Sequence, residues 1–132
     1  MLVGIPHDQV DKCWSIVSPI LQRGIARNNG DYELSDVYHG LMRRDMQLWA
    51  WITDNNIRAA CITQILHMHH KRVCLMLLVA GTGLKDFAKT QDIIADWARG
   101  QGCSQMECNG RDGWLRVLKN WKKVWTTIRR DI

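Results

Sequence analysis

The sequence predicts an α/β domain, chiefly because of a strand, turn, helix and strand in its second half. Residues 73–80 form the longest uninterrupted apolar run, a glycine turn follows at residues 81–83, and residues 86–99 are amphipathic at helical spacing. A short strand-like stretch at residues 103–108 comes next and ends at Asn109 and Gly110. Two strands joined through a helix in this way run parallel in a covered sheet, and the helix start points N–H groups beyond the first strand. An anion is therefore the expected ligand at that turn.

Two helices are expected before the first strands. Asp8 can cap the first helix, whose apolar residues recur at helical spacing, namely Val10, Trp14, Val17 and Leu21. Pro19 suits the first position of a new helix, so we expect a kink or two short helices there. After a loop at residues 24–30, Ser35 precedes a short amphipathic helix that ends near Arg44.

Three antiparallel strands are then expected in succession. Residues 47–53 are apolar on both alternating faces, which is typical of a strand covered on both sides. Residues 54–56 predict a tight turn, because Asn tolerates the left-handed conformation that such turns need. Residues 57–67 predict the partner strand, and a turn at His69 and His70 leads into the run at 73–80.

Beyond Gly110 the pattern predicts one more helix and one more strand. The apolar residues of the helix fall on one face, at Trp114, Val117, Leu118 and Trp121. Residues 124–130 are rich in Val, Trp, Thr and Ile and predict a closing strand. The expected order is ααβββαβαβ, in a single domain over residues 1–132, since the length suits one core and no repeat interrupts it.

The composition indicates a reduced protein with no membrane segment. The 132 residues include seven Trp and five Cys, and the cysteines lie mostly in apolar segments without a CxxC pair, which favours free thiols in a reducing compartment. Residues 1–11 lack the basic and apolar regions of a secretory signal, and the longest apolar run is too short to cross a bilayer as a helix.

The net charge of +5 is concentrated at the end of the chain. Residues 1–110 hold eleven Lys or Arg and eleven Asp or Glu, whereas residues 111–132 hold seven basic and two acidic side chains. A basic segment suits a polyphosphate cofactor, a nucleic acid or an acidic protein surface, or it is a solvated face without a partner. The Trp residues follow core periodicity, so nucleic-acid binding is not favoured.

A histidine cluster at His67, His69 and His70 is the only pattern that suggests a metal. No carboxylate or thiol accompanies it at ligand spacing, and a hairpin turn explains the same residues, so no metal site is expected. Cys103 and Cys108 lie five residues apart and face opposite sides of a strand, which argues against a disulfide between them.

The element order and several sequence runs resemble the GNAT superfamily of acetyl-CoA-dependent N-acetyltransferases. The runs are QLWAWI at 47–52, ACIT at 60–63, GTG at 81–83, DWARGQGC at 96–103 and GRDGWLRVL at 110–118. Together they are similar to small GNAT-like proteins encoded by tailed bacteriophages. The resemblance implies a mixed, mostly antiparallel sheet with a central parallel pair and helices on both faces, and a location in the host cytoplasm or the virion.

The resemblance also implies a coenzyme site at the glycine turn. In the family, the loop after the fourth strand binds the pyrophosphate of coenzyme A through backbone N–H groups, and the matching residues here are Gly81, Thr82, Gly83, Leu84 and Lys85. The stretch keeps two glycines of the family pattern, and Asp86 beside it would repel a pyrophosphate. The alternative is a plain strand-to-helix turn capped by Asp86. Arg111, after the fifth strand, is expected near the carboxyl ends of the parallel pair, where ligands bind.

Catalytic residues follow from the same comparison. Leu118 stands where the family often has the Tyr that protonates the departing thiolate, and Glu107 is the only acid placed to receive the amine proton. Asn109 matches a family Asn that contacts the pantetheine arm or a water, and it is equally a turn former before Gly110. Two functions stay open: acetyl transfer from acetyl-CoA to an amine acceptor, aided by proximity alone, or a non-catalytic phage protein that contacts virion, assembly or host proteins.

Overall fold

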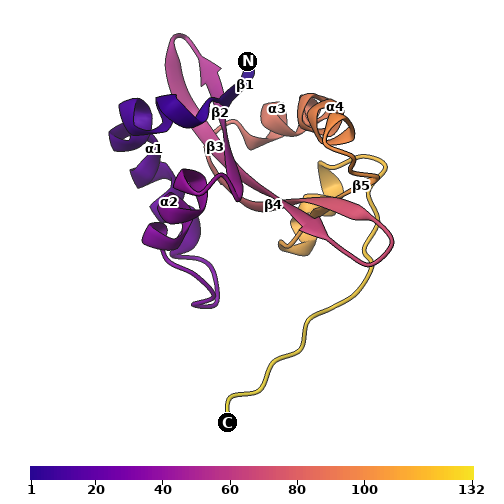
Figure 1. Cartoon of the computed structure of the whole chain (residues 1–132). Coiled ribbons are helices and arrows are strands. Elements are labelled where there is room, and N and C mark those ends of the chain that lie inside the picture. Colours follow the sequence, from indigo (N-terminus) through magenta and orange to yellow (C-terminus); the bar gives the residue numbers. More distant parts are fainter.

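One five-stranded sheet organises the structure. The computed structural model describes residues 1–132, and its strands lie in the order β1 (Leu2–Ile5), β2 (Met46–Thr53), β3 (Asn56–His67), β4 (Arg72–Gly81) and β5 (Gln105–Cys108) (Figure 1). The first four strands pair antiparallel, and β4 pairs parallel with β5. The predicted mixed, mostly antiparallel sheet is confirmed.

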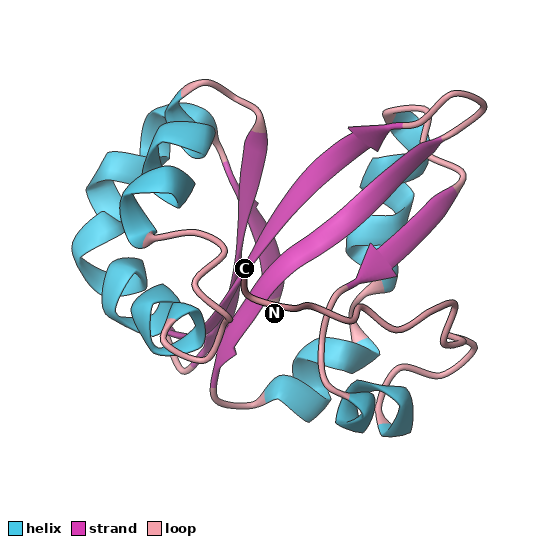
Figure 2. Cartoon of the chain, turned by 90° about the horizontal axis from the view of Figure 1, so that it is seen from below, coloured by secondary structure: helices cyan, strands magenta, loops and turns pink.

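Helices cover both faces of this sheet, as predicted (Figure 2). On one face, α1 (Val10–Ile25) and α2 (Leu34–Met42) bury Val17, Leu21 and Val37 against Leu48 and Ile62 of the sheet. On the other face, α3 (Leu84–Lys89) and α4 (Asp92–Gly100) enclose a second core, which contains Trp49, Cys61, Cys74, Met76, Phe87 and Ile94. No helix combines the length and the apolar character that crossing a membrane requires.

The turn between β2 and β3 and a set of polar side chains on these two strands both have well-defined geometry. Asp54 and Asn55 have φ values of 51° and 60°, so the turn between β2 and β3 is left-handed as predicted. The indole N–H of Trp49 donates to Thr63 Oγ1 at 3.0 Å, and Thr63 donates to Gln47 Oε1 at 2.9 Å. These two hydrogen bonds satisfy the buried polar groups between two central strands.

The first half of the chain differs from the prediction in three places. Residues 2–5 form β1, which the sequence pattern did not reveal. A single α-helix, α1, runs through Pro19 where two helices or a kink were expected, and Gln9 instead of Asp8 precedes it. An interior proline costs about 3 kcal/mol, but α1 buries five apolar side chains worth about 1.5–3 kcal/mol each against the sheet. Glu33 caps α2 in place of Ser35, in a reciprocal pair with Asp36.

The second half differs more. Residues 86–99 form two helices instead of one, with a break at Thr90, whose hydroxyl donates to the Phe87 carbonyl at 2.8 Å. The final helix predicted beyond Gly110 is reduced to a short 3-10 helix, Asp112–Arg116, and Asn120, within the predicted span, has φ 68°, which does not fit a right-handed helix. The observed order of strands and α-helices is therefore βααβββααβ.

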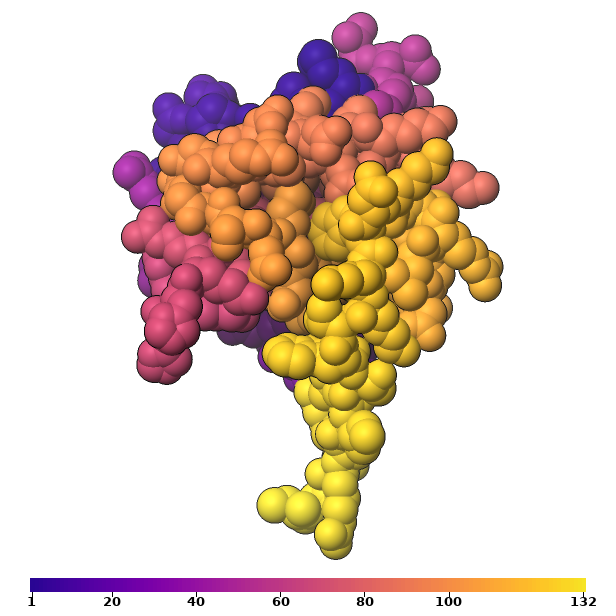
Figure 3. Space-filling view, turned by 90° about the vertical axis from the view of Figure 1, so that its right-hand side faces the viewer, coloured from indigo at the N-terminus to yellow at the C-terminus, as the bar shows by residue number.

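The prediction of a closing strand at residues 124–130 is wrong. This segment is extended but pairs with no strand, and Trp125 and Ile128 are 71% and 91% exposed. The last residues leave the body of the molecule (Figures 1 and 3). A side-chain pattern typical of strands forms one only where a neighbouring backbone takes up its hydrogen bonds, and here none does.

Candidate functional site

The two parallel strands separate halfway along β4 and open a cleft. Their last paired residues are Met76 and Cys108, whereas β4 continues to Gly81. Beyond Met76, the edge of β4 that faces β5 has no strand neighbour, so the backbone N–H and C=O groups on that edge have no strand partner.

A β-bulge lies where the strands separate. Ile62 of β3 pairs with Leu78 and Thr63 pairs with Met76, which leaves Leu77 as the extra residue of β4. The bulge changes which side chains face each core: Met76 belongs to the core under α3 and α4, whereas Leu77 and Leu78 both face α1 and α2. Bulges of this kind often redirect backbone groups beside a site.

A cavity of about 620 Å³ fills the cleft. Its floor is β4, one wall is the chain that follows β5, and the other wall is the end of α1 with the loop after it. The glycine turn with the start of α3 closes one end, and the full lining is Arg23, Gly24, Arg27, Asn28, Tyr32, Met76, Leu77, Leu78, Val79, Ala80, Gly81, Thr82, Leu84, Lys85, Cys108, Asn109, Gly110, Arg111, Gly113, Trp114 and Val117. A volume of this size suits a small molecule or cofactor.

The charge of this cavity is strongly one-sided. Four cations line it, Arg23, Arg27, Lys85 and Arg111, and no Asp, Glu or His does. None of the four forms an ion pair or a side-chain hydrogen bond, whereas all five ion pairs of the molecule lie elsewhere. Four unpaired cations around a cavity raise its positive potential and favour an anionic ligand.

The glycine turn is held tightly at one end of the cavity. Gly81 has φ +117°, and a Cβ placed there would meet the Arg58 carbonyl and lie 2.6 Å from Ala59 Cα. Thr82 N–H donates to that same carbonyl at 2.9 Å. Gly83, at φ +72°, precedes α3, which is only six residues long. An anion bound at this turn would therefore be held by the nearby cations more than by a helix dipole.

Asp86 does not have the effect expected from the sequence. Its carboxylate lies 3.7 Å from Lys89 Nζ, it is exposed, and it is not among the residues that line the cavity. It also does not cap α3, since Gly83 is the cap residue and no side chain bonds there. The capping expected of Asp86 is therefore wrong, and its carboxylate lies outside the cavity lining, beside Lys89.

The end of α1 and the loop after it form a wall of the cavity that the sequence did not predict. Gly24 packs so closely on β4 that an added Cβ would lie 2.8 Å from both Leu78 and Ala80. The Tyr32 hydroxyl donates to the Leu77 carbonyl at 3.4 Å, and Asn28 Nδ2 donates to the Tyr32 carbonyl at 3.2 Å. Burial raises the pKa of Tyr32, so its hydroxyl keeps its proton at neutral pH. The sequence pattern predicts only a loop at residues 24–30 and no part of a site there.

Most residues expected at the site line the cavity, namely Gly81, Thr82, Leu84, Lys85, Asn109 and Arg111. Gly83 shapes the turn but faces Trp51 and does not line it. Glu107 lies on β5, where it pairs with Leu75 of β4; its side chain is half-buried and does not line the cavity. Leu118 is buried. Cys108 lines the cavity, and burial raises the pKa of its thiol to about 11.

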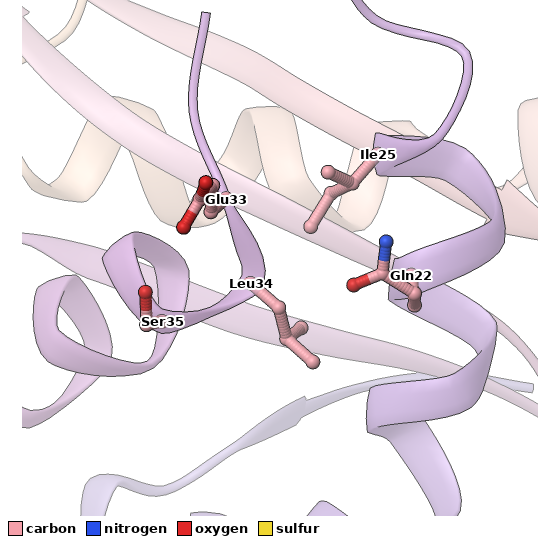
Figure 4. A pocket seen from close by; sticks show the side chains of 5 residues that line it. All are labelled: Gln22, Ile25, Glu33, Leu34 and Ser35. Atoms are coloured by element: carbon pink, nitrogen blue, oxygen red, sulfur yellow. The ribbon is translucent and has the colours of Figure 1, made fainter. Parts of the chain in front are cut away.

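A second, smaller hollow of about 310 Å³ lies between the end of α1 and the start of α2. Figure 4 shows its lining, with Gln22 and Ile25 on one side and Glu33, Leu34 and Ser35 on the other. Its single carboxylate, Glu33, takes part in the α2 capping box and offers no partner for a ligand.

The sequence matches no protein-family model and no curated protein. Its structure resembles an aminoglycoside acetyltransferase from an uncultured soil metagenomic sample in complex with sisomicin, at TM-score 0.74 and 8% identity, over 100% of this chain and 95% of that one. A predicted acetyltransferase from Clostridium acetobutylicum with acetyl-CoA gives a TM-score of 0.69 at 13% identity, over 98% and 95% of the two chains. A ribosomal-protein-alanine N-acetyltransferase from Brucella melitensis gives 0.64 at 14%, over 98% and 99%. Identities this low establish the architecture alone: the chain has the fold of the GNAT acetyltransferases.

Proposed function

We propose that the protein is an acetyl-CoA-dependent N-acetyltransferase with the cavity between β4 and β5 as its active site. The observation that carries this proposal is the second half of β4, whose edge toward β5 has no strand partner. It runs from the bulge at Leu77 to a glycine turn near cations that form no ion pair. The five residue steps from Leu77 to Thr82 span about 16 Å. The pantetheine arm has roughly 13 bonds between sulfur and phosphorus, about the length of four or five extended residues.

The residues present fit the coenzyme. Lys85 and Arg111, with the backbone N–H of Gly81, would hold the phosphates. The free edge of β4 would pair with the amides of the pantetheine arm in the manner of an added strand. Tyr32 and the bulge at Leu77 would then flank the acyl group.

The reaction exchanges one acyl bond for another. Acetyl-CoA supplies a thioester whose carbon–sulfur bond breaks as a carbon–nitrogen bond forms to the amine, so that the amine loses one proton and the sulfur gains one. Tyr32, which stays protonated and lies at the bulge, would donate the proton to sulfur. Glu107, the only carboxylate of β5, would accept the amine proton through water, and Asn109 would hold the pantetheine arm or that water. Holding the two reactants together supplies much of the rate.

Calorimetry with acetyl-CoA and with coenzyme A tests the proposal. We expect micromolar affinity for the wild type. The double variant Lys85→Gln with Arg111→Gln should bind about thirtyfold more weakly, at about 1 kcal/mol per lost charge contact. Lys89→Gln is the matched control, because Lys89 lies one turn further along α3 and outside the cavity. No binding at millimolar coenzyme would exclude the proposed acetyltransferase activity.

A non-catalytic role in a bacteriophage is the second candidate, on the resemblance to GNAT-like phage proteins. Two observations favour it: no carboxylate or imidazole lines the cavity, and the basic segment 122–132 leaves Trp125 and Ile128 exposed for contact with another protein. Its location would then be the host cytoplasm or the virion. Detection in purified virions, or capture of one defined host protein that is lost when Trp125 and Ile128 become Ser, would support it. Absence from both preparations would leave it without support.

A further inference from the structure

We infer that the amine acceptor carries an anionic group, a carboxylate in the simplest case, and that Arg27 binds it. The inference rests on the proposed acetyl transfer and deepens it, because it assigns the class of acceptor. Its basis is the wall of the cavity formed by the end of α1 and the loop after it.

The position of Arg27 follows from its neighbours on both sides. Its backbone N–H donates to the Gly24 carbonyl at 3.1 Å, and Gly24 packs on Leu78 and Ala80. The next residue, Asn28, bonds to the Tyr32 carbonyl, and Tyr32 bonds in turn to Leu77. Arg27 is therefore held between two anchors on the part of β4 just past the bulge. Lys85 follows the glycine turn at the far end of β4, where the phosphates would lie.

The charges around this wall exclude a polycationic acceptor. Such an amine needs carboxylates for its additional ammonium groups, and the cavity offers none. The only acid between Arg23 and Tyr32 is Asp31, and Arg129 binds its carboxylate at 2.7 Å. Arg27 has no partner of its own in the molecule, so a carboxylate or phosphate on the acceptor would complete it.

The same charges help an amine to react. An ammonium group that enters a cavity with four cations is disfavoured relative to the free amine, because like charges lower its pKa. Only the free amine attacks a thioester. A carboxylate on the acceptor offsets the repulsion during binding, whereas the reacting nitrogen still loses its proton more readily. This effect supplies part of what a general base in the cavity would otherwise provide.

The test compares amines that differ only in one carboxylate. The probes are ω-amino acids of increasing length and 4-(aminomethyl)benzoate, each paired with the alkylamine or benzylamine that lacks the carboxylate, together with spermidine and sisomicin. Coenzyme affinity is measured first by calorimetry, and acetyl transfer is then followed as thiol release. We expect at least one carboxylate-bearing amine to exceed its neutral partner about tenfold in kcat/KM, with spermidine and sisomicin unreactive.

Arg27→Gln should abolish that preference by raising KM for the carboxylate-bearing amine, while the Kd for acetyl-CoA changes less than about twofold. Lys12→Gln is the control, because it removes one charge from α1 outside the cavity. Coenzyme binding with equal or better transfer to neutral amines or polyamines, or with no transfer to any carboxylate-bearing amine, overturns the inference and leaves the coenzyme site intact. Failure to bind the coenzyme overturns the proposed function and the inference together.

Discussion

Gly81 is the position where one added methyl group should matter most. In Gly81→Ala the residue would keep φ +117°, a conformation that costs about 1–3 kcal/mol for a residue with a Cβ. The Cβ would also meet the Arg58 carbonyl and lie 2.6 Å from Ala59 Cα, and both are backbone atoms of β3 that cannot rotate away. Overpacking of this kind adds about 1–3 kcal/mol. We expect a total loss of about 3 kcal/mol.

Thermal unfolding followed by Trp fluorescence measures this loss. For 132 residues the unfolding entropy is about 0.28 kcal/mol per kelvin, so the expected decrease in Tm is about 10 °C. The Thr82 N–H bond to Arg58 would be displaced too, so coenzyme affinity should fall with stability. Gly100→Ala is the control, since a Cβ at this last residue of α4 meets no atom within 4 Å and should stabilise by up to about 1 kcal/mol. Similar Tm values for the two variants would refute the strain assigned to Gly81.

Three further results are expected. Thr63→Val leaves the buried indole N–H of Trp49 without its acceptor and should cost about 1–3 kcal/mol in urea unfolding, whereas an unchanged midpoint would mean that the polar chain stabilises little. Removal of residues 124–132 should change Tm by less than about 2 °C, because this segment pairs with no strand and its one ion pair, between Arg129 and Asp31, is exposed; a large decrease would show that it contributes to the fold. Iodoacetamide should modify Cys108 slowly at pH 7 and faster as the pH rises toward its pKa of about 11, since only the thiolate reacts, and coenzyme should protect it; rapid modification at pH 7 would contradict this environment.

Much of the architecture was predictable from local patterns. The apolar runs gave β2, β3 and β4 within one or two residues, and the Asp54 and Asn55 turn formed as its residue types require. Each of these elements depends on side-chain alternation or on backbone preference over a few neighbouring residues. The short strand β1 lacks such a pattern in its four residues and becomes a strand only because β2 offers its edge.

The candidate site was only half predictable. Lys85 and Arg111 lie beside a recognisable turn and strand end, whereas Arg23, Arg27 and Tyr32 are brought to the same cavity by a helix that carries no site motif. Tyr32 contacts Leu77 across 45 residues of sequence, and no local rule expresses that contact. The catalytic roles considered for Glu107 and Asn109 remain proposals.

The sequence by itself determined that this chain alternates strands and helices, that a glycine turn follows its most apolar strand, and that its excess positive charge lies at the end. These properties depend only on residues that are neighbours along the chain. Only the tertiary structure decided that β5 leaves β4 at Met76, that cations from three separate segments surround the resulting cavity, and that residues 124–130 remain unpaired. A strand requires a partner and a binding site requires convergence in space, and both depend on residues that are distant along the chain.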